Sequence, residues 1–443
     1  MAEVAYICKR TIVSAKPVQP GKYCSFSVLD RLMEQNWLKI VYYFQTPGTR
    51  EPGELTKKLR ESMSEMLTSF PIVTGRLLKD PEGHWMIKCN DAGVRMVEAR
   101  AKGSVEDWLK SVDREKELKL IHWEEMFHKP YFWSTFYAQI TEFEEDGLAI
   151  GLSCFHLLAD PTCATMFIKA WADVTFTGKM LDPPLFNPLP PRRPGRQNPN
   201  HEPYIDLIDS YKPLIEKANM VTDTKHATIA LAFSDPMVRA CMATCRTTDQ
   251  SNPSPFEALA GLFWVCLSKL KRSSDGLIDM SICLDMRKVL HLDNGFFGNC
   301  MVYNKISSRY VKEYKLSDAA EAIGEVVAKM DSDAIVDLID WLQQNDYQSP
   351  PLMNGCDLIC VSLEGVDPYL AVFEEGLVPI RASYYVEPVV GAGHVWILPS
   401  PKGEGPLSRV VMVTLPWDEA IKLCEDDLIL HLSPTILMGV NKY

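Results

Sequence analysis

The chain has 443 residues, of which 47% are hydrophobic and 23% carry a charge. This balance predicts a soluble globular protein, and the length is sufficient for two domains of ordinary size. The formal net charge of −12 excludes broad attraction to nucleic acid or to anionic lipid, because both are themselves negatively charged.

Helices and strands are predicted in both halves of the chain from the spacing of apolar residues. Helices are predicted at 54–68 and at 256–270, the second of them amphipathic. Strands are predicted, in chain order, at 38–44, 84–88, 136–141, 147–154, 228–233, 358–363, 394–398 and 409–415. The fold class that follows from this mixture is α/β.

Residues 182–203 are the one break in composition along the chain. They hold eight prolines together with Arg192, Arg193 and Arg196, and proline is excluded from helix interiors and central strands. We therefore predict a stiff connector over 182–225, kept soluble by its charges. It joins an N-terminal domain (1–181) to a C-terminal domain (226–443) of similar size.

Cysteine and histidine spacing excludes other classes of protein. The thirteen cysteines are scattered and form no Cys-x-x-Cys pair, which argues against a disulfide framework or a zinc ribbon and favours a reducing compartment. The histidines lack metal-ligand spacing, so we expect no metal. We also expect no secretory signal and no membrane span, because the first residues have no long apolar core and no run of 18 apolar residues occurs.

The most informative pair of residues is His156 and Asp160. The apolar run 147–154 ends just before the histidine, and helical spacing begins at Asp160. The imidazole is thus predicted where a buried strand gives way to a helix, and a neutral histidine there can act as a general base. The alternative is a core histidine with satisfied hydrogen bonds, because so short a motif also arises by chance.

Acyl transfer is the chemistry that such a base would serve. The neutral imidazole takes a proton from an acceptor hydroxyl or amine, which then attacks a thioester. Asp160 need not touch the ring, so no catalytic triad is assumed. A carboxylate near the core does need a charged partner, because an unpaired buried charge is costly.

Further motifs, in order along the chain, make it resemble the plant BAHD acyltransferase family over nearly its whole length. They are Ser27-Val28-Leu29-Asp30, Phe70-Pro71-Ile72-Val73-Thr74-Gly75-Arg76-Leu77, Phe256-Glu257-Ala258-Leu259-Ala260, Leu284-Asp285-Met286-Arg287 and Phe296-Phe297-Gly298-Asn299. The resemblance implies a monomer of two domains like those of chloramphenicol acetyltransferase, with a long crossover and a channel between them. It further implies that acyl-CoA enters this channel beside His156, and that Asp160 is structural and pairs with Arg287.

The second signature of the family, Asp-Phe-Gly-Trp-Gly, is degenerate in this chain. By position it falls on Val372-Phe373-Glu374-Glu375-Gly376, where only Phe373 and Gly376 remain. Near a developing oxyanion or the phosphates of CoA, the two carboxylates would oppose negative charge. On an exposed loop they would simply be solvated.

This degenerate signature, together with residues 88–95, 123–130 and 148–153, resembles the ECERIFERUM 26-like branch of cuticular wax proteins. The branch implies a partner of the fatty-acid elongase condensing enzyme, acting in the cytoplasm at the face of the endoplasmic reticulum. Such a partner binds a long acyl chain and has no need of the His-x-x-x-Asp pair. The other hypothesis, favoured by the intact His156, is an acyl-CoA-dependent O- or N-acyltransferase. Neither requires a cofactor beyond acyl-CoA as co-substrate.

Three basic residues, Lys269, Lys271 and Arg272, close the helix predicted at 256–270. They are a candidate patch for the phosphates of CoA, since lysine and arginine both bind phosphate strongly. The alternative is a solvated basic turn, because cations also suit the C-terminus of a helix.

Overall fold

The computed structural model describes residues 3–16, 21–46, 51–124, 133–191, 204–216, 224–246, 252–271, 276–306, 314–345, 358–389 and 391–440. The predicted residues Arg192, Arg193, Arg196 and Arg272 lie outside this part of the chain.

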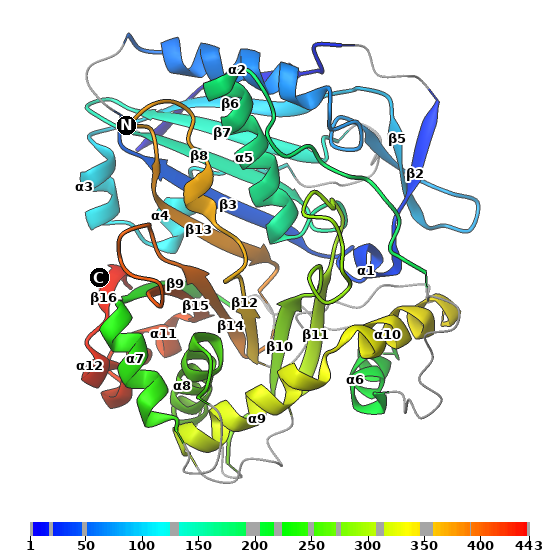
Figure 1. The fold of residues 1–443 in the computed structure, drawn as a ribbon. Coiled ribbons are helices and arrows are strands. Elements are labelled where there is room, and N and C mark those ends of the chain that lie inside the picture. The colour runs from blue at the N-terminus through cyan, green and yellow to red at the C-terminus, as the bar shows by residue number, and fades with distance from the viewer. Residues whose placement is uncertain are drawn as a thin grey trace. The chain divides into compact units, whose positions relative to one another are not determined.

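The chain divides into two compact units, whose elements are labelled in Figure 1. The first comprises Met1–Asn187, Asp293–Asn299 and Asp367–Glu387, and the second comprises Pro188–Leu292, Cys300–Val366 and Pro388–Tyr443. Two segments from the C-terminal half of the sequence therefore belong to the same unit as His156. The division after Asn187 falls within the proline-rich stretch, while the domain boundaries at 181 and 226 stay predictions.

A six-stranded mixed sheet, in the order β1-β6-β7-β8-β3-β13, forms the core of the first unit. β6 and β7 are parallel, and the other neighbours are antiparallel. Every residue of β8 is buried, as is typical of a strand covered on both faces. In sheet order the strands span Val4–Ile12, Val94–Ala101, Phe136–Phe143, Leu148–Phe155, Trp37–Phe44 and Pro379–Glu387.

A small antiparallel sheet and short helices complete the first unit. The sheet has the order β2-β5-β4, with strands Lys22–Ser25, Trp85–Cys89 and Arg76–Lys79. The helices are α1 (Val28–Arg31), α2 (Glu54–Leu67), α3 (Val105–Lys110), α4 (Arg114–Leu118), α5 (Pro161–Thr177) and the 3-10 turn η3 (Pro368–Leu370). Helix α5 begins at Pro161, where a missing N–H costs nothing, and ends at Gly178, whose φ of 71° suits glycine.

The second unit is built on a seven-stranded sheet in the order β11-β10-β12-β14-β15-β9-β16. β12 is parallel to β10 and β14, and the other neighbours are antiparallel. In sheet order the strands span Met301–Ile306, Met280–Asp285, Leu358–Ser362, Gly393–Pro399, Arg409–Pro416, His226–Phe233 and Thr435–Met438.

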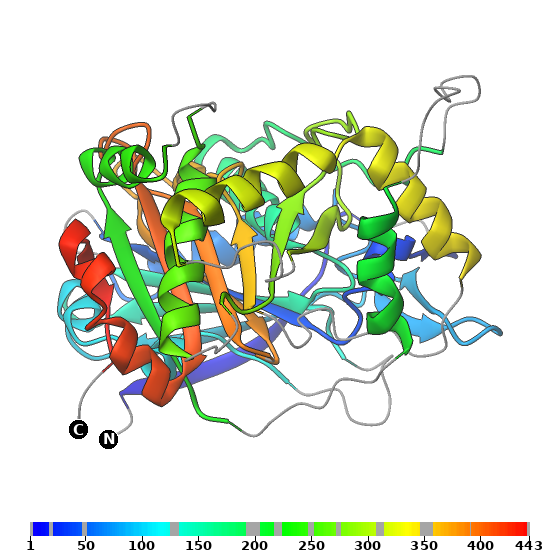
Figure 2. The same cartoon turned by 90° about the horizontal axis from the view of Figure 1, so that it is seen from below.

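Helix α8 (Pro255–Leu270) lies against β12 and β14 of this sheet (Figure 2). The prediction of an amphipathic helix here was wrong in one respect, because α8 is buried on nearly all sides up to Ser268. α9 (Leu316–Lys329) also packs on it, where a Cβ on Gly261 would lie only 3.2 Å from the amide nitrogen of Ala320. The remaining helices are α6 (Ile205–Glu216), α7 (Asp235–Thr244), α10 (Ser332–Gln344), α11 (Trp417–Leu423) and α12 (Asp427–Leu432).

Among the described residues, no helix combines the length and apolar character needed to cross a membrane. Within the same residues, no cluster of His, Cys, Asp and Glu side chains is placed to hold a metal ion.

Candidate functional site

His156 lies one residue after β8 and five residues before the first residue of α5, so the predicted change from strand to helix is confirmed. Its backbone N–H donates to the carbonyl of Asn36 at 3.0 Å. The side chain is only 2% exposed. The end of a buried strand thus fixes both the backbone and the burial of this residue.

The ring of His156 is held by Asn299, a residue of the same unit. Nδ1 lies 3.0 Å from Oδ1 of Asn299. The amide nitrogen of Asn299 donates to the carbonyls of His156 at 2.8 Å and Leu157 at 3.4 Å, which leaves the amide oxygen facing the ring. Because an amide oxygen only accepts, Nδ1 carries the proton and Nε2 has the free lone pair.

Burial lowers the pKa of the His156 imidazole below its ordinary value of 6.5. The charge of Asp160 and the hydrogen bonds at the ring, including that to Asn299, act in the opposite direction but are smaller. The ring is therefore neutral at pH 7, with Nε2 unprotonated. This is the state in which an imidazole can accept a proton from a hydroxyl or an amine.

Asp160 is the N-cap of α5 and is fully buried. Its Oδ1 accepts from the backbone N–H of Cys163 at 2.9 Å, which satisfies one of the free N–H groups of the first turn. Arg287 lies in the second unit, where its backbone N–H and Nη1 both donate to Asp285. The pairing of Asp160 with Arg287 stays a prediction.

Replacing Asp160 separates its two predicted roles. Asp160→Ala removes the cap and the charge, and we expect a loss of about 1 kcal/mol from the cap alone. Asp160→Asn keeps a good cap but removes the charge, so the predicted ion pair with Arg287 would be lost while Arg287 keeps Asp285, and we expect a further loss of stability. Thermal melting of both variants measures the contribution of the helix cap and that of the predicted ion pair separately. If Asp160→Asn melts like the parent, the pairing hypothesis is wrong.

The degenerate signature forms a tight turn in the first unit. Phe373 is fully buried, and its ring makes edge contacts with Phe44 and Trp171 at 5.5 and 5.3 Å between centroids. Gly376 has a φ of 78°, which suits glycine. The two residues that survive from the family signature are therefore those with a structural role in the turn.

The two carboxylates of this turn lie in different surroundings. Glu374 Oε2 is 3.5 Å from Nζ of Lys58 on α2, and Glu375 is exposed. Val372, which replaces an aspartate, is half-buried. A local lysine thus faces one of these charges and solvent the other.

The predicted basic patch is only partly described. Lys271 at the end of α8 forms an ion pair with Glu419 of α11, and Lys269 is exposed. Arg272 lies outside the described residues. Lys271 is thus already paired with a carboxylate, while the exposed Lys269 fits the alternative of a solvated basic turn, and CoA binding here stays a prediction.

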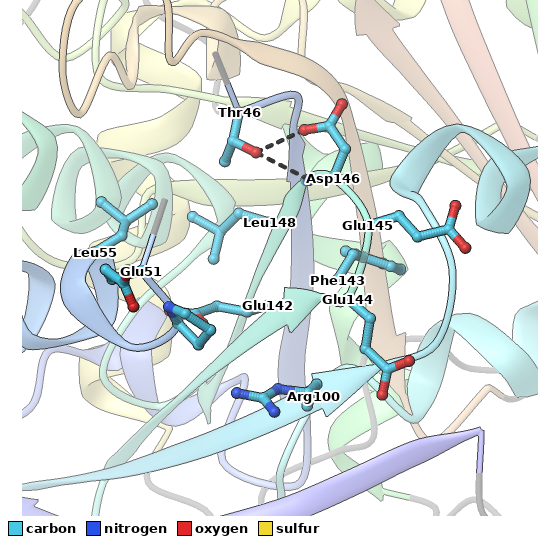
Figure 3. Close-up of a pocket in the computed structure, with 12 residues that line it drawn as sticks. Thr46, Glu51, Leu55, Arg100, Glu142, Phe143, Glu144, Glu145, Asp146 and Leu148 are labelled. Carbon is cyan, nitrogen blue, oxygen red and sulfur yellow. Dashed lines mark hydrogen bonds between the residues drawn. The ribbon is translucent and has the colours of Figure 1, made fainter. Parts of the chain in front are cut away.

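A surface pocket lies beside the turn between β7 and β8 (Figure 3). Its lining includes Glu142, Glu144, Glu145 and Asp146, with Arg100 as the one basic residue among those that line it. Such an acidic lining would repel the phosphates of CoA. No residue of the predicted site lines this pocket.

The comparisons with known proteins decide the family. The model of the Transferase family matches residues 2–416. The chain belongs to this family, the BAHD acyltransferases.

Two curated BAHD relatives from Arabidopsis thaliana match most of the chain. "Protein ECERIFERUM 26-like" is 26% identical over 422 residues, 93% of this chain and 92% of its own. "Protein ECERIFERUM 26" is 27% identical over 414 residues, 92% of each chain.

Solved structures place the BAHD chain in the same fold. The crystal structure of vinorine synthase has a TM-score of 0.72 at 17% identity, covering 98% of this chain and 99% of its own. The F. sporotrichioides protein TRI101, in complex with coenzyme A and T-2, has a TM-score of 0.67 at 12% identity, covering 94% of this chain and 100% of its own. The predicted fold class, two mixed α/β units of an acyltransferase type, is confirmed.

Asn299 is the functional residue that sequence reasoning missed. Phe296-Phe297-Gly298-Asn299 was used only as a family motif, and no spacing in the sequence connects it with residue 156. Its proximity to His156 depends on the return of segment Asp293–Asn299 to the first unit. A polar residue at the end of a buried motif was the one available signal.

Proposed function

We propose that this BAHD protein promotes the elongation of very-long-chain fatty acids for cuticular wax, as a partner of the elongase condensing enzyme. The likeness to two ECERIFERUM proteins over more than nine-tenths of the chain carries this proposal. The degenerate signature supports it, since Phe373 and Gly376 keep the turn while Val372, Glu374 and Glu375 replace its other residues.

In this role the protein binds a long acyl chain and presents it to its partner without performing chemistry. Each buried methylene contributes about 0.8 kcal/mol, so an apolar site can hold such a chain firmly. The net charge of −12 suits contact with a basic protein surface better than direct binding to anionic lipid. The proposed place of action is the cytosolic face of the endoplasmic reticulum.

The geometry at His156 favours a second candidate, an acyl-CoA-dependent O- or N-acyltransferase. The contact from Nδ1 to Asn299 leaves Nε2 as a base, which a protein without chemistry does not require. A distant structural relative, TRI101, is a complex with coenzyme A, and acyl-CoA is the co-substrate proposed here. In this candidate Nε2 takes the proton of the acceptor as the acceptor attacks the thioester carbonyl. The carbon–sulfur bond then breaks, and the imidazolium returns the proton to the departing CoA thiolate.

Co-expression in yeast discriminates the two functions. Wild type and His156→Ala are each expressed with a plant condensing enzyme, and the fatty acids are profiled against the condensing enzyme alone. We expect both versions to extend the chains equally, because binding does not use Nε2. Loss of extension in the variant, or turnover of an acyl-CoA with an acceptor in place of extension, would replace the first candidate by the second.

A further inference from the structure

We propose that Asp30 is a positioning residue for His156, acting through Asn299. Its carboxylate fixes the orientation of the Asn299 amide, and that amide holds the imidazole proton on Nδ1. The inference deepens the second candidate function, since it concerns the base that this candidate uses.

The two oxygens of Asp30 have separate partners. Oδ2 accepts from the backbone N–H of Ser27 at 2.8 Å and closes the capping box of α1. Oδ1 accepts from Asn299 twice, from the backbone N–H at 2.8 Å and from Nδ2 at 2.9 Å. One oxygen is therefore sufficient for the helix, and the other serves Asn299 alone.

An ionised carboxylate cannot donate, so it admits one orientation of the amide. Nδ2 of Asn299 lies between Oδ1 of Asp30 and the carbonyl of His156, at 2.9 and 2.8 Å. If the amide turned over, its oxygen would face these two acceptors, and its NH₂ group would face Nδ1 of the ring. The contacts with Asp30 and with the carbonyl of His156 would then each replace a hydrogen bond by a repulsive contact between two acceptors. The amide oxygen is thus directed at His156.

The loop that carries Asn299 is also tied to the start of α5. The backbone N–H of Gly298 donates to Sγ of Cys163 at 3.2 Å, and that thiol donates to the carbonyl of Gly298 at 3.4 Å. Asp30 and Cys163 therefore hold consecutive residues of one loop from two helices. A loop held at two consecutive residues positions the Asn299 amide more closely than a single contact would.

Helix capping alone does not account for Asp30. Burial raises the pKa of Asp30 above its ordinary value, opposed by the hydrogen bonds from Asn299 and Ser27. A buried carboxylate is thus held at an energetic cost for a helix of only four residues. The contacts to Asn299 supply the additional reason for its presence.

Measuring which nitrogen of His156 carries the proton tests the proposal directly, because a purely structural role of Asp30 would leave the position of that proton unchanged. Protein labelled with ¹⁵N in its imidazoles is measured by two-bond proton–nitrogen correlation, and His156→Ala assigns the signal among the nine histidines. In wild type we expect Nδ1 to be protonated and Nε2 to be unprotonated. In Asp30→Ala we expect the two nitrogen shifts to move toward each other, as the proton is shared between them.

Two matched variants separate this role from capping. Asp30→Asn retains an oxygen for Asn299, so we expect the wild-type signal. Ser27→Ala removes the other half of the capping box and leaves Asp30 in place, so the signal should again be that of wild type. Asp30→Ser, whose hydroxyl cannot serve both partners, replaces Asp30→Ala if that variant does not fold.

A wild-type ring protonated on Nε2 would overturn the proposal, as would a wild-type signal in Asp30→Ala or Asp30→Ser. Neither measurement uses a substrate or a partner. A failure of the proposed functions in yeast is therefore distinguishable from a failure of this inference.

Discussion

If the protein acts as the acyltransferase of the second candidate, His156→Ala is expected to lower acyl transfer from an acyl-CoA by about 10²–10⁴-fold, the usual contribution of a positioned general base. This loss of rate is expected because Asn299 contacts Nδ1, so that Nε2 keeps the lone pair that accepts the proton. Release of CoA with an alcohol or amine acceptor, measured as kcat with saturating acyl-CoA, gives the ratio. The matched control is His122→Ala in the same unit, whose ring lies 3.2 Å from Glu124. Equal rates for wild type and His156→Ala would remove His156 from the chemistry.

The same base predicts how the rate depends on pH. Burial lowers the pKa of His156 below 6.5, and a base must be neutral to accept a proton. The rate is therefore fully present above this lowered pKa and is lost as the pH falls through it. In a profile of kcat/KM against pH, the fall in rate on the acid side should therefore be centred below pH 6.5. An acid limb centred above that value would contradict a buried, neutral imidazole.

Trp171→Ala is expected to destabilise the first unit by about 3–5 kcal/mol, the usual cost of removing a large buried aromatic side chain. Trp171 on α5 is fully buried, and its Nε1 donates to the carbonyl of Leu59 at 2.9 Å and to Ser62 at 3.2 Å. Its ring also meets Phe373 of the degenerate signature. In thermal melting the transition of this unit should fall by about 10 °C.

Trp171→Phe is the matched control for this substitution. It keeps an aromatic ring beside Phe373 and removes the indole N–H, so we expect a smaller loss of about 1–2 kcal/mol. Similar melting of Trp171→Ala and wild type would show that the turn at 372–376 does not depend on this packing.

Periodicity was sufficient to predict elements that have either a continuous apolar run or a clear apolar face. The strand predicted at 147–154 is β8 (Leu148–Phe155), and the helix predicted at 54–68 is α2 (Glu54–Leu67). Edge strand β1 escaped prediction because most of its residues are exposed, so no apolar period marks it. The amphipathic interpretation of α8 failed because a helix packed by both a sheet and α9 has no polar face to present.

The candidate site likewise has a part that the sequence predicts and a part that it does not. The sequence located His156 at the end of a buried strand and Asp160 at the start of a helix, since both signals lie within a few residues of each other. It also located the degenerate signature at 372–376. It gave no reason to connect Asp30, Asn299 and His156, because no local rule acts across more than a hundred residues.

The sequence by itself determined the family, the α/β class and the residue that can act as a base, because each is encoded in short segments. Only the tertiary structure decided the chemical state of that base. The proton is assigned to Nδ1 by an amide from segment Asp293–Asn299, which is itself oriented by a carboxylate on α1. Hydrogen bonds of this kind depend on distance in space, and the fold alone brings these three side chains within about 3 Å of their partners.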